Sequence, residues 1–339
     1  MKTILTVNGP VDVNACKMAL SHEHIFIDLT NQSAPSACPD KISAADRAAL
    51  QRDPYCRKDN RLLDDFETAV SEGKVLLDSG CDTVVDCTTD EIGRDPLLLK
   101  KFADASGLNV VAGCGWYTGD THSKATLEKS VEQLAEELLD EVVNGIGDTG
   151  IRPGVIGEIG TSKTILPCEW RCLEAAAMVQ KKCDLAMQVH IYPWSVNGLD
   201  VAEFLISLGV APDRIVICHP DIAPDYSYIT ALFKRGVWVE MDNFGKEFTP
   251  AEGGFADGAF ATDEVRADIA VRCIKDGFGK QLLLTNDICL KCMLSQYGGR
   301  GYNHVFADIL PMIVEKGIPE EYLKSQIMHS NPLNMLAGK

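Results

Sequence analysis

Two histidines one residue apart, His22 and His24, are the sharpest chemical signal in the sequence. They lie near the end of an apolar segment, residues 17–25, that predicts a β-strand. Successive side chains of a strand point to opposite faces, so His22 and His24 share one face and Glu23 takes the other. Two imidazoles on one face suit two positions of a zinc coordination sphere. Taken alone, such a pair is more often structural than metal-binding.

Four further polar residues follow the same pattern. Each lies at the C-terminal end of an apolar segment that predicts a strand, and the chain has only seven histidines to distribute. In a barrel of parallel strands these ends converge on one face, where catalytic groups gather. Chance placement would leave most of the histidines on exposed helices and loops. We therefore predict that six side chains meet in one site: His22, His24, Glu158, His190, His219 and Asp287.

The elements that must position these residues alternate between strands and helices. Several apolar segments carry no polar residue, as in Val84-Val85, which is typical of strands buried on both faces. The order predicts an α/β fold, a (β/α)₈ barrel, with an open doubly wound sheet as the alternative. No glycine-rich fingerprint follows a strand and no linker divides the chain, which favours the barrel. The predicted strands cover residues 17–25, 83–87, 109–114, 154–159, 185–190, 214–219, 237–241 and 281–287, and the predicted helices include residues 95–105, 126–143, 169–182, 200–208 and 264–276.

Some segments lie outside a minimal barrel. Residues 1–16 predict a short N-terminal β-hairpin around Asn8-Gly9. Loops at residues 29–61 and 244–262 follow the first and seventh strands, so we expect these extended βα loops over the C-terminal face. The glycines of residues 244–262 indicate either a mobile lid or a merely floppy loop. We predict a single domain, residues 1–339.

Composition narrows the function classes. Lys and Arg total 32 against 49 Asp and Glu, which gives a net charge of −17. A field of that sign repels phosphate backbones and anionic lipids, so we expect neither nucleic acid nor membrane as a partner. No apolar run approaches the ~18 residues of a spanning helix. Thirteen cysteines at irregular spacing, with no export signal, predict thiols in a reducing cytoplasm.

With these residues in place, the chain resembles the phosphotriesterase family of the amidohydrolase superfamily. The resemblance rests on five segments and covers nearly the whole chain. Its motifs are specific for a metallohydrolase barrel and say little about the substrate. The segments are Ser21-His22-Glu23-His24, residues 151–161, Val189-His190, His219-Pro220-Asp221 and Leu284-Thr285-Asn286-Asp287.

The resemblance implies a centre of two divalent metal ions. Zinc is the first choice of metal, and manganese and cobalt are the alternatives. His22, His24 and Asp287 would hold the more buried ion, and His190 and His219 the more exposed one. A carboxylate and a hydroxide would bridge the ions. Phosphotriesterases proper use a carboxylated lysine as the bridge, whereas this chain has Glu158 in the matching place, ranked well above Lys163. The departure argues against organophosphate hydrolysis, and family likeness also implies a homodimer.

A centre of this kind lowers the pKa of bound water to ~7 and polarises an oxygen of the substrate. Asp287, beside the bridge, could take the nucleophile's proton and pass it to the leaving group. We expect a small-molecule substrate with a carbonyl centre, a lactone or carboxylic ester first and an amide close behind. The alternatives are a phosphoester hydrolase, a mononuclear deaminase of the same superfamily, and a non-catalytic metal-binding barrel.

Substrate contacts are predicted from residues that follow the strands. Tyr117 and Tyr192 follow the third and fifth strands and could wall a pocket, or simply cap the barrel. Lys246 and Arg300 follow the seventh and eighth strands and could hold an anionic group, as could Arg266 and Lys291. The pairs Cys168/Cys172 and Cys289/Cys292 are interpreted as structural thiols rather than as metal or redox sites.

Overall fold

Eight parallel strands alternate with helices in the computed structural model, which describes residues 2–32, 38, 41–252 and 254–338. All eight strands expected from the apolar segments are present, and the chain has the (β/α)₈ architecture. The strands are β3 (Met18–Glu23), β6 (Cys81–Asp86), β7 (Asn109–Ala112), β8 (Ile156–Gly160), β9 (Met187–His190), β10 (Ile215–Cys218), β11 (Trp238–Met241) and β12 (Leu282–Leu284). The main helices between them are α2 (Phe66–Asp78), α3 (Pro96–Ser106), α5 (Val131–Asn144), α6 (Pro167–Cys183), α7 (Gly198–Ser207), α8 (Tyr226–Lys234) and α9 (Asp263–Lys275).

The strands form two parallel sheets that meet at two seams. One sheet has the order β3-β6-β7 and the other the order β12-β11-β10-β9-β8. At the first seam, the Gly157 N–H donates to the Cys114 carbonyl at 2.7 Å. At the second, the Asp287 N–H donates to the His22 carbonyl at 3.2 Å. The first bond joins the segment after β7 to β8, and the second joins the segment after β12 back to β3. The C-terminal ends of all eight strands therefore face one opening.

The core follows the alternation of each strand. One set of side chains, such as Leu20, Val84 and Ile217, packs outward against the helices. The other set fills the barrel interior with small and medium-sized residues. This interior cluster includes Ala19, Val85, Val111, Val155, Ala186, Val216 and Leu283.

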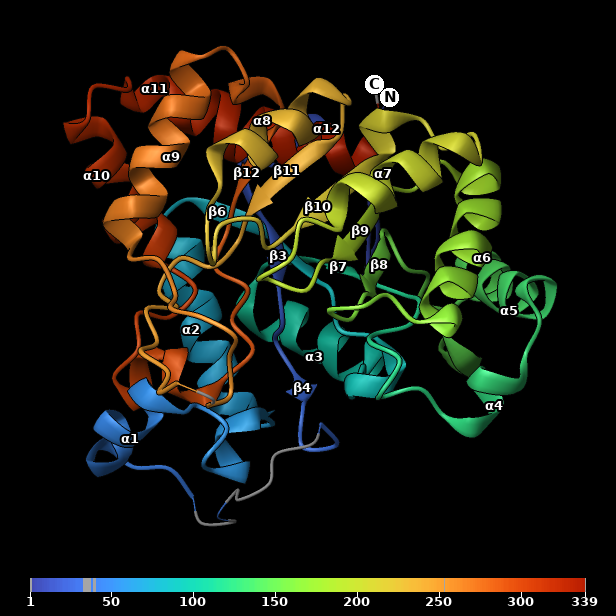
Figure 1. The fold of residues 1–339 in the computed structure, drawn as a ribbon, viewed down its shortest axis with the longest axis horizontal. Helices are drawn as coiled ribbons and strands as arrows, with labels where there is room; N and C mark the ends of the chain where they lie inside the picture. Colours follow the sequence, from blue (N-terminus) through green and yellow to red (C-terminus); the bar gives the residue numbers. More distant parts are fainter. Residues whose placement is uncertain (1, 33–37, 39–40, 253, 339) are drawn as a thin grey trace.

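The N-terminal end of the barrel is closed by both ends of the chain. The predicted hairpin is present as β1 (Thr3–Thr6) paired antiparallel with β2 (Gly9–Asp12). Its Ile4 side chain packs into the interior cluster together with Leu333 and Leu336 of α12 (Asn331–Ala337). Figure 1 shows the two termini together at this end, at the top of the view. The opposite end is therefore left for loops and a site.

The remaining helices are short. After β12 the chain forms α10 (Leu310–Glu315), α11 (Glu320–Tyr322) and two π-helical stretches, Val305–Ile309 and Leu323–Ser330. One predicted helix, residues 126–143, is divided into α4 (Lys124–Glu128) and α5 because Ser130 caps α5 in a capping box with Gln133. Single turns of 3₁₀ helix lie at Val13–Ala15, Ala44–Asp46, Lys58–Arg61, Asp90–Ile92, Gly147–Thr149, Pro212–Arg214, Gly279–Gln281, Lys291–Met293 and Ser295–Tyr297.

Two long loops cover the C-terminal face. The first carries β4 (Ile27–Asp28), α1 (Arg47–Arg52) and β5 (Leu62–Leu63), at the bottom of Figure 1. The second runs from β11 to α9, and its Thr249 N–H donates to the Gln51 carbonyl of the first loop at 2.8 Å. The two loops therefore support each other above the strand ends. Among the described helices, none has the length and apolar character of a transmembrane segment.

Candidate metal centre

The six predicted ligands come from five strand ends. His22 lies within β3, and His24 lies one residue beyond its end. His219 and Asp287 follow β10 and β12, and both adopt left-handed backbone conformations, with φ of 66° and 49°. Such conformations are rare for residues other than glycine and often occur at functional sites. Here they turn the chain out of each strand at the residue that faces the site.

Glu158 of β8 lies at the middle of the group. Its Oε1 atom is 3.4 Å from His24 Nε2. Its Oε2 atom is 3.3 Å from His190 Nδ1, 3.3 Å from His219 Nε2 and 3.5 Å from His22 Nε2. Asp287 Oδ1 lies 3.3 Å from His24 Nε2 on the other side. The structure therefore brings all six side chains together, with one carboxylate between two sets of histidines.

The group fits a pair of metal ions. His22 Nε2 is buried and has no hydrogen-bond partner, although it faces Glu158 and Asp287. Three subsets of the six offer ligand atoms within 4.8 Å of one another: His22, His24 and Glu158; His22, His219 and Asp287; and Glu158, His190 and His219. Imidazole nitrogens and carboxylate oxygens are the donors that zinc and similar divalent ions take in proteins. Their role as ligands stays a prediction.

The charges at the centre are strongly coupled. Burial favours neutral His24, but Asp287 and Glu158 outweigh burial and raise its pKa to about 9. Burial has the same effect on His219, where Asp242 and Glu158 raise the pKa to about 10. Burial alone would raise the pKa of Asp287, yet the Lys246 ammonium and the neighbouring histidines hold it well below its ordinary range. His24 and His219 thus hold protons that a bound cation would displace.

Three of the four histidines are each held by a partner at the Nδ1 nitrogen. His22 Nδ1 lies 3.1 Å from Glu240 Oε2, and His219 Nδ1 lies 2.9 Å from Asp242 Oδ1. His24 Nδ1 lies 2.8 Å from Thr88 Oγ1. Partners of this kind fix the tautomer and the ring orientation of metal-binding histidines.

Glu23 secures the loop that carries Asp287. Its side chain points away from the histidines, as the strand alternation predicts. Its Oε1 accepts hydrogen bonds from Thr285 Oγ1 and from the backbone and side-chain nitrogens of Asn286, at 2.7 to 2.9 Å. Its Oε2 accepts from the Ile288 N–H at 2.9 Å. Asp287 is therefore held between two anchored neighbours.

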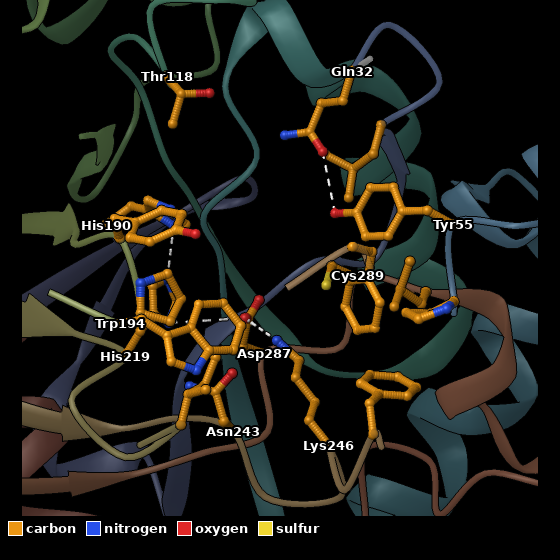
Figure 2. A pocket seen from close by; sticks show the side chains of 18 of the residues that line it. Gln32, Tyr55, Thr118, His190, Trp194, His219, Asn243, Lys246, Asp287 and Cys289 are labelled. Atoms are coloured by element: carbon orange, nitrogen blue, oxygen red, sulfur yellow. Dashed lines mark hydrogen bonds and ion pairs between the residues drawn. The ribbon is translucent and has the colours of Figure 1, made fainter. Parts of the chain in front are cut away.

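A cavity of about 780 Å³ opens above the group. Tyr117, Tyr192 and Lys246, three of the residues predicted to contact the substrate, line it. The Tyr117 ring packs edge-on against His190 with centroids 5.0 Å apart. Lys246 Nζ forms an ion pair with Asp287 Oδ2, as Figure 2 shows. Five aromatic side chains whose rings contact one another form an aromatic wall of the cavity: Tyr55, Trp194, Phe248, Phe255 and Phe260.

Other predicted residues lie away from the cavity or are engaged elsewhere. The Arg300 side chain is 68% exposed, lies 3.9 Å from Asp308 and is absent from the cavity wall, because turns after β12 carry it outward. Lys163, the second choice as a bridge, is exposed at the rim and pairs with Asp257 at 2.5 Å. Arg266 and Lys291 are buried in ion pairs with aspartates.

The cysteine pairs show no sign of a metal site. Cys168, Cys172, Cys289 and Cys292 are free thiols. None of the four belongs to a group of potential ligands found among the described residues.

Sequence reasoning missed four residues next to the centre. Glu240, Asp242 and Asn243 lie at the end of β11, and Asp221 follows His219. All four side chains are fully buried. The signal was available, because Glu240 interrupts an apolar run in a strand that had to be buried on both faces.

Comparisons with known proteins identify the family of the chain. The model of the phosphotriesterase family matches residues 2–336. An N-acetyltaurine hydrolase from Xenopus tropicalis is 30% identical over 346 residues, which cover 99% of this chain and 98% of that protein.

Two solved structures extend the likeness to the fold. A resiniferatoxin-binding protein from Rhodobacter sphaeroides superimposes with a TM-score of 0.94 at 30% identity, covering 98% of this chain and 94% of that one. An organophosphorus hydrolase from Deinococcus radiodurans gives a TM-score of 0.78 at 27% identity, covering 99% and 97%. The resemblance inferred from the motifs is confirmed, as is the assignment as a hydrolase. The chain is a metal-dependent hydrolase that belongs to the phosphotriesterase family.

Proposed function

We propose that this enzyme holds two divalent ions, with zinc as the first choice of metal. We propose that it hydrolyses a small N-acyl amide that carries an acid group. The observation that carries the proposal is the convergence of four imidazoles and two carboxylates, with the unpartnered His22 Nε2 among them. His22, His24 and Asp287 would hold one ion, His190 and His219 the other, and Glu158 would bridge them. Ions bound there would lower the pKa of a water molecule and polarise the substrate carbonyl.

The residues of the chain supply the proton transfer. Asp287 would take a proton from the attacking water and pass it to the leaving amine. The pKa of Asp287 is held low by the Lys246 ammonium, which pairs with it. Because a cation bound to Asp287 would compete with that ion pair, Lys246 would become available to the acid group of the substrate.

The relatives favour an amide over the lactone or ester that we expected first from the sequence. The curated relatives are named for N-acetyltaurine, whose scissile bond is an amide and whose other end is a sulfonate. In this cavity, Lys246 would take that acid end. The metal chemistry serves esters, lactones and amides alike, so the preference rests on likeness and on Lys246.

A lactone or ester with a bulkier apolar part is the second candidate. The observation in its favour is the aromatic wall, since a cavity of about 780 Å³ lined by Phe248, Phe255 and Phe260 exceeds the needs of an acetyl group. Tyr192, whose ring centroid lies 5.8 Å from that of Trp194, extends this wall.

The cellular setting belongs to the proposal as well. We place the enzyme in the cytoplasm, supported by free thiols such as Cys289 and Cys292. We also propose a homodimer on family likeness alone. Sedimentation equilibrium would test the second point, with one chain per particle as the contrary result.

The test is a substrate panel on protein with measured metal content. We expect N-acyl amides of taurine and of amino acids to be cleaved faster than lactones, aryl esters or aryl phosphates. A preference for phosphotriesters would overturn the amide assignment, and one ion per chain with deamination would favour the mononuclear alternative. The variant Lys246→Met should raise the KM for acidic amides more than for neutral ones. The matched control is Lys291→Met, since Lys291 is buried in ion pairs with Asp59 and Asp64 outside the cavity.

A further inference from the structure

The Asn243 side chain is a polar group in the cavity wall whose oxygen has no partner. Asn243 directly follows Asp242 beyond the end of β11, is completely buried, and lines the cavity together with His219, Lys246 and Asp287. Figure 2 shows it reaching into the cavity near Lys246. Its Oδ1 atom is buried without a hydrogen-bond partner. An unmade hydrogen bond of this kind is costly, so it calls for a ligand.

The orientation of the amide is determined by its neighbours. Asn243 Nδ2 donates to Asp221 Oδ1 at 2.9 Å and to Asp242 Oδ1 at 2.6 Å. Both of its hydrogens are therefore used, and both partners are carboxylates, which only accept. A flipped amide would direct its oxygen at two carboxylates. Oδ1 must then be the atom that is left over.

The position of the amide relates it to the proposed reaction centre. Asp242 Oδ1 accepts from Asn243 Nδ2 and also contacts His219 Nδ1 at 2.9 Å. One carboxylate oxygen thus connects the Asn243 amide to a proposed metal ligand. The backbone carbonyl of Asn243 accepts a hydrogen bond from the backbone N–H of Lys246 at 3.0 Å. A molecule held between the metal centre and Lys246 would pass beside Asn243.

The unpartnered Oδ1 atom of Asn243 can only accept a hydrogen bond, so its ligand must be a donor. Among the described residues that line the cavity, the buried polar atoms without a partner are Asn243 Oδ1 and Trp194 Nε1. The indole nitrogen can only donate, so it cannot receive an N–H group. The carboxylates of Glu158 and Asp287 are already engaged by histidines and Lys246. Among the described residues of the cavity wall, Asn243 Oδ1 is therefore the buried acceptor that has no partner within the protein and is left for a donor on the substrate.

We infer that Asn243 Oδ1 accepts the N–H of the scissile amide and thereby selects secondary amides over esters and lactones. The inference rests on the proposed function and adds to it the residue that reads the scissile bond. An ester places an oxygen where the N–H would be, so Oδ1 stays unpaired and meets a second lone pair. Sites built to bind a substrate N–H or O–H discriminate strongly against analogues that lack it, by ~10⁴-fold or more in the best cases.

The experiment compares matched substrates. N-acetyltaurine, its N-methyl derivative and O-acetyl isethionate share the acyl and sulfonate groups and differ at the linking atom. On the wild-type enzyme we expect kcat/KM for the N-methyl amide to be at least ~100-fold below that for the N–H amide. Equal rates for the two amides would overturn the inference without any variant.

Two variants separate acceptance of the N–H from a structural role. Asn243→Ser withdraws the acceptor, because the shorter side chain does not reach the position of Oδ1, and we expect kcat/KM to fall about 10- to 100-fold for the amide and less than about threefold for the ester. Asn243→Asp loses both hydrogen bonds that Nδ2 donates to Asp221 and Asp242 but keeps an oxygen in place, so it should preserve more of the amide preference than Asn243→Ser does. Metal content is measured for both variants to confirm an intact centre.

The outcomes distinguish the two levels of the proposal. An equal loss on amide and ester in Asn243→Ser overturns the role of Asn243 and leaves the amide hydrolase in place. A wild-type enzyme that cleaves lactones or phosphates but none of the amides overturns the proposed function, and with it this inference.

Discussion

The His22 ring is held differently at its two nitrogens. Nδ1 faces Glu240, whose Oε2 also accepts from Gln188 Nε2 at 3.1 Å and from Cys218 Sγ at 3.3 Å. Nε2 faces the proposed metal position without a partner. A carboxylate behind a histidine makes the ring a stronger ligand and fixes its orientation. Glu240 is therefore a positioning residue that acts through His22.

Replacing this carboxylate should weaken metal binding. We expect Glu240→Gln to lower the affinity for zinc about 10- to 100-fold, measured by titrating metal-free protein against a competing chelator. The matched control is Glu72→Gln, because Glu72 is also buried but accepts from Ser295, away from the centre. A Glu240→Gln protein that binds zinc as tightly as the control would contradict the role of Glu240.

The proposed role of Asp287 in proton transfer can be tested by replacing its side chain. An asparagine has nearly the same shape and can still bind a metal ion through its oxygen, but it cannot carry a proton. We expect Asp287→Asn to keep most of its metal and to lose ~10³-fold in kcat, in line with the usual contribution of a positioned general base. Near-normal turnover of fully metallated variant protein would show that another group moves the proton.

The loop between β11 and α9 carries two of the residues proposed to contact the substrate and covers part of the cavity. Its base carries Asn243 and Lys246 and is fixed by the buried Arg266, which donates to the Lys246 carbonyl at 2.9 Å. Its tip is attached across the cavity rim, where Asp257 accepts from Lys163 at 2.5 Å and from Tyr192 at 2.7 Å. The structure thus shows a secured base and an exposed attachment at the tip. Whether the loop, residues 244–262, acts as a lid stays a prediction.

Releasing the tip should affect substrate binding more than chemistry. Exposed ion pairs contribute ~1 kcal/mol or less, so we expect Asp257→Ala to raise KM about two- to fivefold with little change in kcat. Hydrogen exchange should become faster in residues 254–262. The control is Asp276→Ala, which removes another exposed tyrosine–aspartate bond, from Tyr226 to the residue that follows α9, away from the cavity. Unchanged exchange and KM in Asp257→Ala would argue against a lid held by this residue.

The base of the loop has an anchor that depends on pH. His304 Nε2 lies 2.7 Å from Asp263 Oδ2, and Asp263 Oδ1 accepts the Gly245 N–H at 2.9 Å. Burial favours a neutral His304, but Asp263 and Asp308 outweigh burial and raise its pKa above the ordinary 6.5. The stabilisation is fully present below pH 6.5 and is lost as pH rises through the pKa of the folded state.

We therefore expect His304→Gln to cost about 1–2 kcal/mol of unfolding free energy at pH 6 and clearly less at pH 10. Urea unfolding of the metal-loaded protein at both pH values measures the difference. His329→Gln is the control, since the His329 ring contacts the Lys17 carbonyl near the opposite end of the barrel. A loss that is equal at the two pH values would show that His304 does not contribute through its charge.

At the scale of the whole molecule, the apolar segments were sufficient to predict the barrel. All eight strands lie where those segments are, because strands buried on both faces leave a strong signal. Their ends were less predictable: β12 stops at Leu284, three residues short of the expected Asp287. Thr285 and Asn286 bind Glu23 instead of continuing the strand. That tertiary contact has no local signature.

Part of the site could be predicted because it depends on where the strands end. The six central side chains share a position at strand ends, which is a property of the fold and can be read along the chain. The role proposed for Asn243 could not be inferred from the sequence, because it depends on the hydrogen bonds that Nδ2 donates to Asp221 and Asp242. Arg300 follows the eighth strand like the others, yet turns direct it to the surface, which sequence distance does not reveal. The single-domain organisation of residues 1–339 stays a prediction.

The central claim is that four imidazoles and two carboxylates hold two divalent ions. Elemental analysis of protein purified without chelator, saturated with zinc and freed of excess metal tests it most directly. We predict two zinc ions per chain in the wild type and about one in the double variant His190→Ala/His219→Ala. A wild-type protein with one ion or none, or a double variant that keeps both, would contradict the account.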